Sequence, residues 1–268
     1  MSPTLLVFAP HPDDAEFFAG GTIARLVQEG WKTILITLTD GRCGSLVHDS
    51  DTLAALRAAE ARQAALILGA EPPVLLGYPD QGLDLLPPGT LREQCTRLIR
   101  QYRPEAVIAE DILAVEEVHP DHRATARAVA EALNAAALPL VYPEHLQTGL
   151  QPHFVIEKYF YGGPSETQNK LVDISATLPV KLRAMSAHRT QVEFLVTEIL
   201  NQAKLADLDA GALLGPAAAD PTAALAWALQ AEAAETGARA GVPYAEAFRY
   251  VRFHPILENL LSTLPEKP

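Results

Sequence analysis

The chain has 268 residues, of which 49% are hydrophobic and 20% are charged, and its formal net charge is −12. This composition is typical of a soluble globular protein, and the length suits one large domain, because a single hydrophobic core stops growing at roughly 250 to 300 residues. The negative charge, without any run rich in Lys and Arg, argues against nucleic acid or an anionic membrane surface as the main partner. We expect a single domain over residues 1–268, with a core at about residues 1–145 and a C-terminal elaboration at 146–268.

The first half of the chain alternates short apolar runs with helical patterns. Four apolar runs indicate buried strands, at residues 5–9, 33–39, 74–76 and 106–109. Three stretches between them have helical periodicity, at residues 20–29, 52–68 and 91–102. Strands separated by such helices predict an α/β fold with a Rossmann-like, mostly parallel sheet and helices on both faces. Ligands of such a sheet bind at the carboxyl ends of its strands, where the connecting loops meet.

The pattern changes beyond Pro139, where we expect further strands and helices to elaborate the sheet. Residues 153–161 and 170–174 indicate strands, and residues 181–205 and 221–236 indicate helices rich in Ala and Leu. Asp220 and Pro221 are typical of a helix start, with an Asp cap and Pro at the first helical position. Residues 211–216 predict a loop between the two helices.

The cysteines and the N-terminus predict a soluble protein of the reducing cytoplasm. Cys43 and Cys95 are far apart and have no metal-binding spacing, so we expect no disulfide framework. The N-terminus lacks the basic stretch, apolar segment and cleavage site of a secretory signal, and no apolar run approaches the length that spans a bilayer.

A His and two adjacent carboxylates follow the first predicted strand. Segment 9–16 (APHPDDAE) contains His11, Asp13 and Asp14 at the carboxyl end of the run 5–9. An unpaired charge near a core carries a large desolvation penalty. A bound metal cation would neutralise the cluster.

A second histidine cluster follows the fourth predicted strand. Segment 119–123 (HPDHR) precedes an apolar helical face that begins at Ala124, and Pro120 suits the first turn of a helix. His119 and His122 therefore lie at a helix entrance, on the same edge of the sheet as the first cluster.

Together the two clusters predict a catalytic metal site. Catalytic zinc typically takes three protein ligands from His, Asp and Glu and leaves one position for water. His11, Asp14 and one of the two later histidines supply such a set. Asp13, next to a ligand but facing another way, is then a candidate for the base that deprotonates the attacking water.

The motifs resemble those of the LmbE-like, or PIG-L, family of zinc-dependent N-deacetylases. The matching positions are segments 11–14 (HPDD), 20–22 (GGT), 78–80 (YPD), 119–122 (HPDH), 188–191 (HRTQ) and 245–248 (AEAF), with Arg57 and Glu60. The resemblance therefore spans nearly the whole chain. Two segments depart from the family pattern: residues 115–118 (VEEV) lack the Gly or Tyr that many members have there, and the loop 40–44 (DGRCG) lacks a common Glu.

The resemblance implies a set of roles for the two clusters. Zinc, or another divalent transition metal in the cell, would be held by His11, Asp14 and His122, with Asp13 as general base. The resemblance settles which later His is the ligand.

It also implies that His119, supported by Asp121, stabilises the oxyanion or protonates the leaving amine. Family substrates are mostly N-acetylglucosamine derivatives. We therefore expect hydrolysis of the N-acetyl group of an N-acetylglucosamine-type amino sugar or a related small molecule. Because some members are oligomers, we also expect a homo-oligomer.

Three further residues at family positions are candidates for substrate binding, namely Arg57, Asp80 and His188. Each has a simpler interpretation: an exposed helical Arg pairs with a residue such as Glu60, an Asp on a Pro-containing turn caps that turn, and a helical His is buried. His254, near the end of the chain, either approaches a neighbouring site in an oligomer or is a turn residue beside Pro.

Two other functions remain open. A Rossmann-like sugar-nucleotide enzyme would coordinate magnesium through carboxylates, but magnesium prefers oxygen ligands, so two ligating histidines argue against it. Segment 20–22 also lacks the spacing of the known phosphate-binding loops. A non-catalytic protein that keeps the fold for binding is the second alternative, which a turnover assay would separate from an enzyme.

Overall fold

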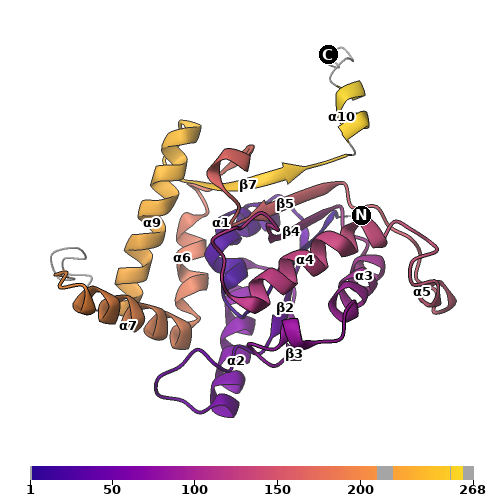
Figure 1. The fold of residues 1–268 in the computed structure, drawn as a ribbon. Helices are drawn as coiled ribbons and strands as arrows, with labels where there is room; N and C mark the ends of the chain where they lie inside the picture. The colour runs from indigo at the N-terminus through magenta and orange to yellow at the C-terminus, as the bar shows by residue number, and fades with distance from the viewer. Residues whose placement is uncertain (1, 210–219, 254, 262–268) are drawn as a thin grey trace.

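A seven-stranded sheet forms the centre of the molecule (Figure 1). The structure, a computed structural model, describes residues 2–209, 220–253 and 255–261. The strands are β1 (Thr4–Ala9), β2 (Lys32–Thr39), β3 (Val74–Tyr78), β4 (Ala106–Glu110), β5 (Glu157–Tyr161), β6 (Lys170–Asp173) and β7 (Ala245–Val251). Their order is β3-β2-β1-β4-β5-β7-β6; β1 to β5 pair in parallel, and β7 is antiparallel to both of its neighbours. The predicted α/β fold with a mostly parallel sheet is confirmed.

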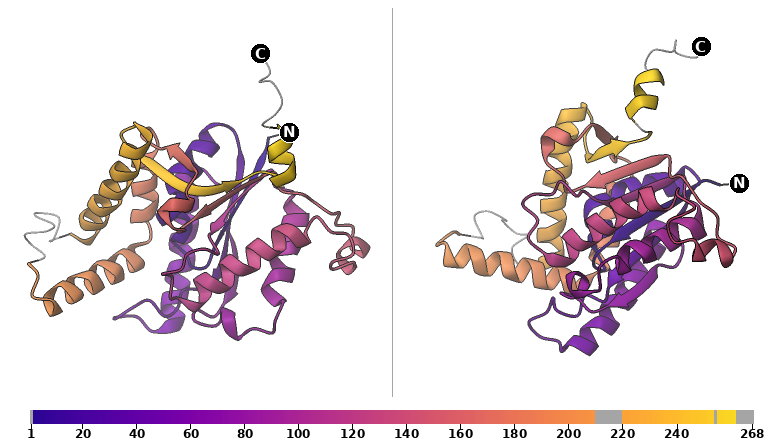
Figure 2. Two further views of the ribbon diagram at one scale, coloured as in Figure 1. Left: turned by 45° about the horizontal axis from the view of Figure 1, so that its top comes forward. Right: turned by 45° about the vertical axis from the view of Figure 1, so that its right-hand side comes forward.

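Helices cover both faces of this sheet. The helices of the described residues are α1 (Asp14–Gln28), α2 (Ser50–Leu68), α3 (Thr90–Tyr102), α4 (Pro120–Ala135), α5 (Glu144–Gln147), α6 (Leu178–Ser186), α7 (Arg189–Leu205), α9 (Pro221–Ala240) and α10 (Pro255–Leu261), with short 3-10 helices η1 (Leu83–Leu85) and η2 (Ser165–Thr167). Helices α7 and α9 pack on each other near α6, and α10 lies beyond the end of β7 (Figure 2).

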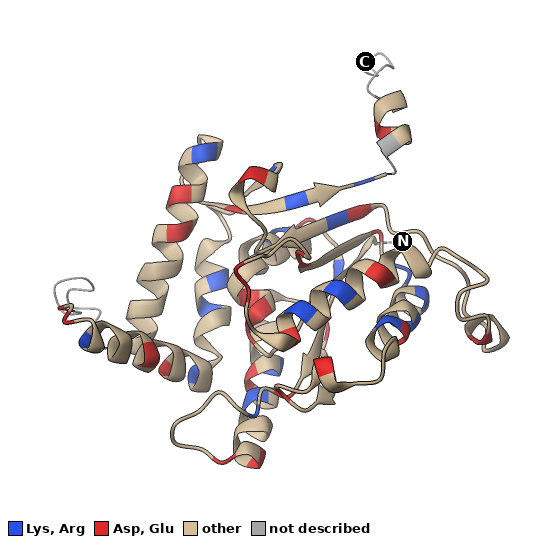
Figure 3. Ribbon diagram, in the orientation of Figure 1, with Lys and Arg blue, Asp and Glu red and all other residues tan. Residues whose placement is uncertain are grey.

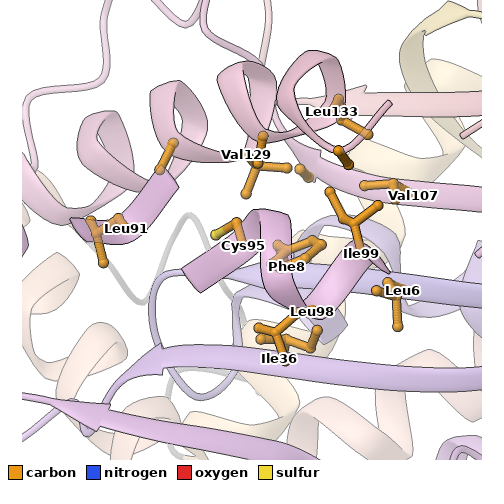
Figure 4. Close-up of a cluster of buried hydrophobic side chains, with 14 of the residues drawn as sticks. Leu6, Phe8, Ile36, Leu91, Cys95, Leu98, Ile99, Val107, Val129 and Leu133 are labelled. Carbon is orange, nitrogen blue, oxygen red and sulfur yellow. The ribbon is translucent and has the colours of Figure 1, made fainter. Parts of the chain in front are cut away.

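The alternation of side chains along β1 divides the core into two layers. Leu6 and Phe8 point to the side covered by α3 and α4, where they meet Cys95 and Val129 (Figure 4). Leu5, Val7 and Ala9 point to the opposite side, covered by α1, α2 and α6. Because both faces of the strand are buried, its sequence is apolar throughout rather than alternating, as expected for a central parallel strand. The sheet therefore presents only its edges and its loops to ligands.

The C-terminal elements differ most from the sequence prediction. The helix expected at 181–205 is two helices, α6 and α7, because the chain turns at His188, which precedes the first residue of α7. Strand β7 was not expected, and it inserts between β5 and β6. The Asp220 cap is confirmed, since its side chain accepts a hydrogen bond from the Thr222 amide. The predicted loop at 211–216 and His254 lie outside the described residues.

The two glycines of α1 allow close packing against α6 and the segment after β6. A Cβ atom on Gly21 would lie 2.8 Å from side-chain atoms of Ile174. Glu246 of β7 accepts hydrogen bonds from the Gly21 and Thr22 amides at 3.0 and 2.8 Å, and it pairs with Lys181 at 2.7 Å. These contacts account for the Gly-Gly-Thr segment without a bound nucleotide.

Charged residues of both signs are interspersed on the helices. Along α4, Arg127 and Glu131 form an ion pair at 2.9 Å, and Figure 3 shows acidic and basic positions following one another on this helix. Within the described part of the chain, no helix is both long and apolar enough to cross a membrane.

Candidate metal centre

The loops after β1, β2, β3 and β4 meet at the carboxyl edge of the sheet and enclose a cavity of about 270 Å³. Helix α7 closes its remaining side. The cavity is lined by His11, Asp13, Asp14, Cys43, Gly44, Arg57, Asp80, Gln81, His119, His122, Gln191 and Phe194. The structure thus brings together most of the site residues predicted from the sequence, in the position expected for a parallel sheet.

Three potential ligand atoms face one another at the base of this cavity. His11 Nδ1 lies 3.2 Å from His122 Nε2 and 3.3 Å from Asp14 Oδ2. His122 Nε2 lies 3.5 Å from the same Asp14 oxygen. All three residues are buried. Their ligand atoms therefore form a nearly equilateral triangle.

Carboxylates flank the outer nitrogen of each of these two histidines. His11 Nε2 lies 3.1 Å from Asp80 Oδ1 and 3.4 Å from Asp121 Oδ2. His122 Nδ1 lies 2.9 Å from Glu110 Oε2, in a close ion pair rather than a well-aligned hydrogen bond. A carboxylate beside one ring nitrogen keeps the proton there and leaves the other nitrogen as a lone-pair donor. The two inner nitrogens, 3.2 Å apart, are then both electron donors, an arrangement that a cation stabilises.

The size of the triangle fits zinc. With bonds of about 2.0 to 2.2 Å, the ligand atoms of a tetrahedral zinc site lie roughly 3.3 to 3.6 Å apart. The observed separations are 3.2, 3.3 and 3.5 Å. Two imidazoles and one carboxylate suit zinc or another transition metal better than magnesium, which prefers an all-oxygen octahedron. The residues present therefore fit the implied metal.

In the metal-free protein, the same groups hold protons instead. Burial lowers the pKa of His122, but the Asp14 and Glu110 carboxylates outweigh this effect and raise the pKa to about 9. Burial also opposes the charged form of His11, and its three neighbouring carboxylates raise the pKa well above the ordinary value. A site that attracts protons onto its ligand nitrogens is one in which a metal cation replaces those protons.

Asp13 lies beside the triangle and is held by Arg57. Its backbone has a φ of 118°, a conformation that L-residues rarely adopt. The Arg57 guanidinium donates to Asp13 Oδ1 at 2.5 Å and to the Pro12 carbonyl at 2.6 Å, which fixes both side chain and backbone. Burial raises the pKa of Asp13 to about 6, even though the Arg57 charge lowers it. Asp13 is therefore ionised at neutral pH but takes up a proton readily.

His119 presents an N–H group toward the cavity. Its Nδ1 accepts a hydrogen bond from the Asp121 amide at 3.2 Å, so the proton of the neutral ring is on Nε2. Gln81 Nε2 lies 2.6 Å from His119 Nε2, so with the ring proton on Nε2 the Gln81 amide must be turned to present its oxygen, which accepts that proton. Burial, together with the nearby charges of His11 and His122, lowers the pKa of His119. The ring is thus neutral at pH 7, and its Nε2–H is a hydrogen-bond donor that Gln81 engages in the free protein.

The Asp121 carboxylate has different contacts from those expected. It accepts hydrogen bonds from the Gln81 and Leu83 amides at 2.7 and 2.9 Å, and it lies near His11 Nε2. Its carboxylate therefore positions the turn after β3 and His11, whereas His119 is supported by the Asp121 backbone amide. Asp121 is in the first turn of α4, where its backbone amide is the donor to the capping side chain of His119.

The three residues expected to bind substrate occupy different places. Arg57 and Asp80 line the cavity, but most of their polar atoms have protein partners: Arg57 bonds Asp13 and backbone carbonyls, and Asp80 bonds His11 and the Cys43 amide. His188 is only 1% exposed and lies behind the cavity wall, with Nε2 3.4 Å from Glu16. This position differs from the expected substrate contact, because the acidic first turn of α1 attracts the ring inward.

Helix α7 contributes two cavity residues that sequence reasoning missed, Gln191 and Phe194. They are three positions apart and so share one face of the helix. Their only sequence signal was the segment 188–191, whose Gln closes the family motif. The loop after β2 adds Cys43 and Gly44, and its Arg42 pairs with Asp40 at 2.7 Å.

Known proteins share both this sequence pattern and this fold. Residues 6–133 match the PIG-L family model, described as GlcNAc-PI de-N-acetylase. Diacetylchitobiose deacetylase of Thermococcus kodakarensis is 34% identical over 189 residues, which cover 70% of this chain and 69% of that protein. A probable N-acetyl-alpha-D-glucosaminyl L-malate deacetylase 2 of Bacillus anthracis is 31% identical over 201 residues, covering 73% of this chain and 84% of that protein.

A solved structure extends the similarity to the C-terminal elements. N,N'-diacetylchitobiose deacetylase from Pyrococcus horikoshii, complexed with its inhibitor MPG, matches with a TM-score of 0.77 at 28% sequence identity. The match covers 94% of this chain and 84% of that chain, so it includes most of the elements beyond β4.

Proposed function

The chain belongs to the PIG-L, or LmbE-like, family of de-N-acetylases, and from this premise we propose that it is a metal-dependent hydrolase of N-acetylated amino sugars. The reaction is removal of the N-acetyl group from an N-acetylglucosamine-type sugar or a related small molecule. The observation that carries the proposal is the triangle of His11, Asp14 and His122 at the base of a cavity that also contains Asp13 and His119.

Zinc is the proposed metal, held by His11 Nδ1, Asp14 Oδ2 and His122 Nε2. When bound, it supplies a Lewis acid for the amide carbonyl and lowers the pKa of water to about 7. Amide hydrolysis needs this help, because an amide is a poor electrophile with a poor leaving group.

Asp13 is proposed as the general base. Its carboxylate lies next to the ligand Asp14 yet makes its own contact with Arg57, so it is free of the triangle. A pKa raised to about 6 by burial brings it close to the operating pH, where a base is both ionised and able to accept a proton. Arg57 holds the carboxylate in place and keeps it ionised at neutral pH.

His119 is proposed to stabilise the oxyanion and then to protonate the departing amine. Its Nδ1 accepts from the Asp121 amide, so the proton of the neutral ring is on Nε2, where a substrate oxygen would take the place of Gln81. The Asp121 amide holds the orientation of the ring when negative charge develops on the substrate oxygen. Asp121, Asp80 and Glu110 orient the histidines and are proposed as positioning residues.

The setting of the enzyme is also a proposal. The two free cysteines, Cys43 and Cys95, agree with a reducing cytoplasm. A homo-oligomer is proposed on the family resemblance alone. Sedimentation of the purified protein at several concentrations would test the oligomer directly.

The first experiment measures acetate release by metal-reconstituted protein. The substrates are N-acetylglucosamine, diacetylchitobiose and glycoside or phosphate derivatives, and Asp13→Asn is the paired control. We expect turnover that depends on the metal and falls about 100- to 10,000-fold in Asp13→Asn with the metal retained. Turnover that is equal in the variant would remove Asp13 from the mechanism. A metal-loaded protein inactive on all of these substrates would favour the non-catalytic alternative.

A further inference from the structure

Gln81 has a backbone conformation that is unfavourable for a residue with a side chain. It lies in the turn after β3, in the wall of the cavity, with a φ of 66°. This value is in the left-handed region, which glycine adopts readily and a residue with a Cβ atom does not. The glycine of the turn, Gly82, comes one position later and has a φ of −124°. Backbone outliers of this kind are concentrated at functional sites.

The backbone of this turn is held without help from the Gln81 side chain. The Asp121 carboxylate accepts hydrogen bonds from the Gln81 and Leu83 amides at 2.7 and 2.9 Å. On the other side, Asp80 Oδ2 accepts a hydrogen bond from the Cys43 amide at 3.1 Å. These contacts account for the path of the chain, and they would form equally well with glycine at position 81.

The side chain of Gln81 has a single polar partner among the residues that the structure describes. That partner is His119, whose Nε2 lies 2.6 Å from the terminal amide of Gln81. Because His119 Nδ1 accepts a hydrogen bond from the Asp121 amide at 3.2 Å, Nε2 has the ring proton and the Gln81 oxygen accepts it. Gln81 is exposed, so its amide can turn into solvent while the backbone of the turn stays in place.

We propose that Gln81 is an internal substitute for the substrate: its carboxamide oxygen accepts the His119 Nε2–H group in the free protein and turns away when the carbonyl oxygen of the N-acetyl group takes its place. The inference rests on the proposed function and makes Gln81 a positioning residue for His119. The two acceptors are chemically alike, because the end of a Gln side chain and an N-acetyl group are both carboxamides. The His119 donor is therefore paired before and after the substrate binds.

This exchange fixes the direction in which Gln81 affects the reaction. The hydrogen bond holds the His119 ring in one tautomer and one orientation, but it must break before the substrate carbonyl can form its own. It therefore stabilises the free protein relative to the complex and weakens substrate binding, whereas the steps after binding are unaffected. A side chain that contacts the substrate would have the opposite effect on binding.

Steady-state kinetics of the metal-loaded protein would compare the wild type with three variants of this residue. Gln81→Gly removes the side chain, Gln81→Met keeps its length without the amide, and Gln81→Glu keeps both the length and an oxygen acceptor. Gln101→Ala is the control, because Gln101 is exposed on α3, away from the cavity residues.

We expect KM to fall about three- to tenfold in Gln81→Gly and Gln81→Met with kcat unchanged, as the loss of one net hydrogen bond in the free protein predicts. Gln81→Glu should raise KM, because a carboxylate holds the N–H group more tightly. A higher KM in Gln81→Gly and Gln81→Met would identify a substrate contact and overturn the proposal. A lower KM in Gln81→Gly alone would mean that the side chain only obstructs the cavity, which would also overturn it.

The hydrogen bond itself can be observed in the substrate-free protein by NMR. In metal-loaded protein with ¹⁵N-labelled histidine, the His119 Nε2–H resonance is identified by its absence from His119→Gln. We expect this resonance in the wild type and in Gln81→Glu, and its loss through exchange with water in Gln81→Gly and Gln81→Met. Equal exchange in the wild type and Gln81→Gly would overturn the proposal.

Acetate, the product of the proposed reaction, tests the exchange of acceptors without turnover. Its oxygen competes with the Gln81 amide for His119 Nε2–H in calorimetric titrations of the metal-loaded protein. We expect Gln81→Gly and Gln81→Met to bind acetate about three- to tenfold more tightly than the wild type, and Gln101→Ala to match the wild type. Equal affinities in all four proteins would overturn the proposal.

The outcomes also distinguish this inference from the proposed function. If the NMR and acetate results are as expected but no substrate releases acetate, the exchange at His119 is retained and deacetylation is rejected. If acetate is released with the same KM in every Gln81 variant, deacetylation is retained and the role of Gln81 is rejected. Failure of both sets of measurements would reject both.

Discussion

The two walls of the cavity differ in the kind of partner that their buried polar atoms have. On the metal side, the outer nitrogens of His11 and His122 each have a carboxylate at 3.1 or 2.9 Å. On the α7 side, Arg57 Nε and Gln191 Oε1 have no partner. The buried nitrogens of the metal side face charged partners within the protein, whereas Arg57 Nε and Gln191 Oε1 have no hydrogen bond within it. The comparison teaches that the predicted metal ligands are held by ion pairs between the loops, and that α7 adds a side chain whose oxygen the rest of the protein does not pair.

Removing a side chain that coordinates the metal should have the most severe consequence for the metal side. His122→Ala should abolish stoichiometric metal binding and lower kcat/KM by about a thousandfold or more, because metal-assisted catalysis is lost. Metal analysis of the purified variant and acetate release would measure both. A variant that loses activity but keeps one equivalent of metal at wild-type affinity would show that His122 is not a ligand.

A change of pH should alter the affinity of the metal side for zinc. In the metal-free protein, Asp14 and Glu110 raise the pKa of His122 to about 9 despite its burial, so this nitrogen is protonated below pH 9. Zinc must then displace a proton from His122 and, because the pKa of His11 is also raised well above its ordinary value, a second proton from His11. Its apparent affinity should therefore fall by at least about tenfold per pH unit below 9, or at least roughly 100-fold between pH 9 and pH 7. Zinc titrations in buffers of different ionisation enthalpy would count the protons released. No release at pH 7 would contradict the assignment.

Neutralising an outer carboxylate should weaken the metal side in smaller steps. Glu110→Gln removes the negative charge beside His122 Nδ1, and Asp80→Asn does the same beside His11 Nε2. Each variant should lose about 10- to 100-fold in metal affinity, as is typical for the partners of ligating histidines. Competition with a chelator measures the loss. Unchanged affinity in both would mean that these carboxylates do not tune the ligands.

Filling the space in front of Gly44 should affect only the other wall. Gly44→Ala places a Cβ 3.1 Å from Gln191 Oε1 and 3.4 Å from Arg57 Nη1, so the Gln191 side chain must shift by a few tenths of an ångström and the added methyl fills this part of the cavity. We expect about a tenfold loss in sugar binding, comparable with the loss of one hydrogen bond, and no change in metal content. A parallel loss of metal would show that the two walls are coupled.

Loss of the contact between Glu60 of α2 and Thr190 of α7 should have the mildest consequence for stability and binding. Glu60→Ala removes the acceptor of two hydrogen bonds from Thr190, which should lower the free energy of unfolding by about 1 kcal/mol and sugar affinity a few-fold. Urea denaturation and calorimetric titration with the sugar would measure the two effects, with Glu193→Gln as control, because Glu193 is exposed on the same helix. Weaker sugar binding without any loss of stability would mean that Glu60 acts on the sugar in another way.

The parts of the protein that could be predicted from sequence are those with local signals. Strands β1 to β4 have continuous apolar runs, and the loops that follow them contain the His and Asp residues of the metal side, so parallel-sheet geometry predicted that these would meet. The contact of Asp121 with the turn after β3 has no local signal, because residues 81 and 121 are 40 positions apart. The same holds for Gln191, whose place in the cavity wall depends on where α7 packs.

The C-terminal half was harder to predict for a similar reason. Strand β7 alternates over only seven residues, and its place between β5 and β6 is set by long-range pairing. The break between α6 and α7 at His188 has neither Gly nor Pro to indicate it. Burial of His188 beside Glu16, rather than a backbone preference, is the contact that the sequence could not reveal.

The contact of Glu246 with α1 has a consequence for how the chain matures on the ribosome. The amides of Gly21 and Thr22 are bonded to a carboxylate more than two hundred positions later, and Lys181 shares that carboxylate. The helix that begins at Asp14 therefore cannot complete its contacts until residue 246 has emerged. During translation, this part of α1 is therefore made early, but it gains its partners only after residue 246 has been added to the chain.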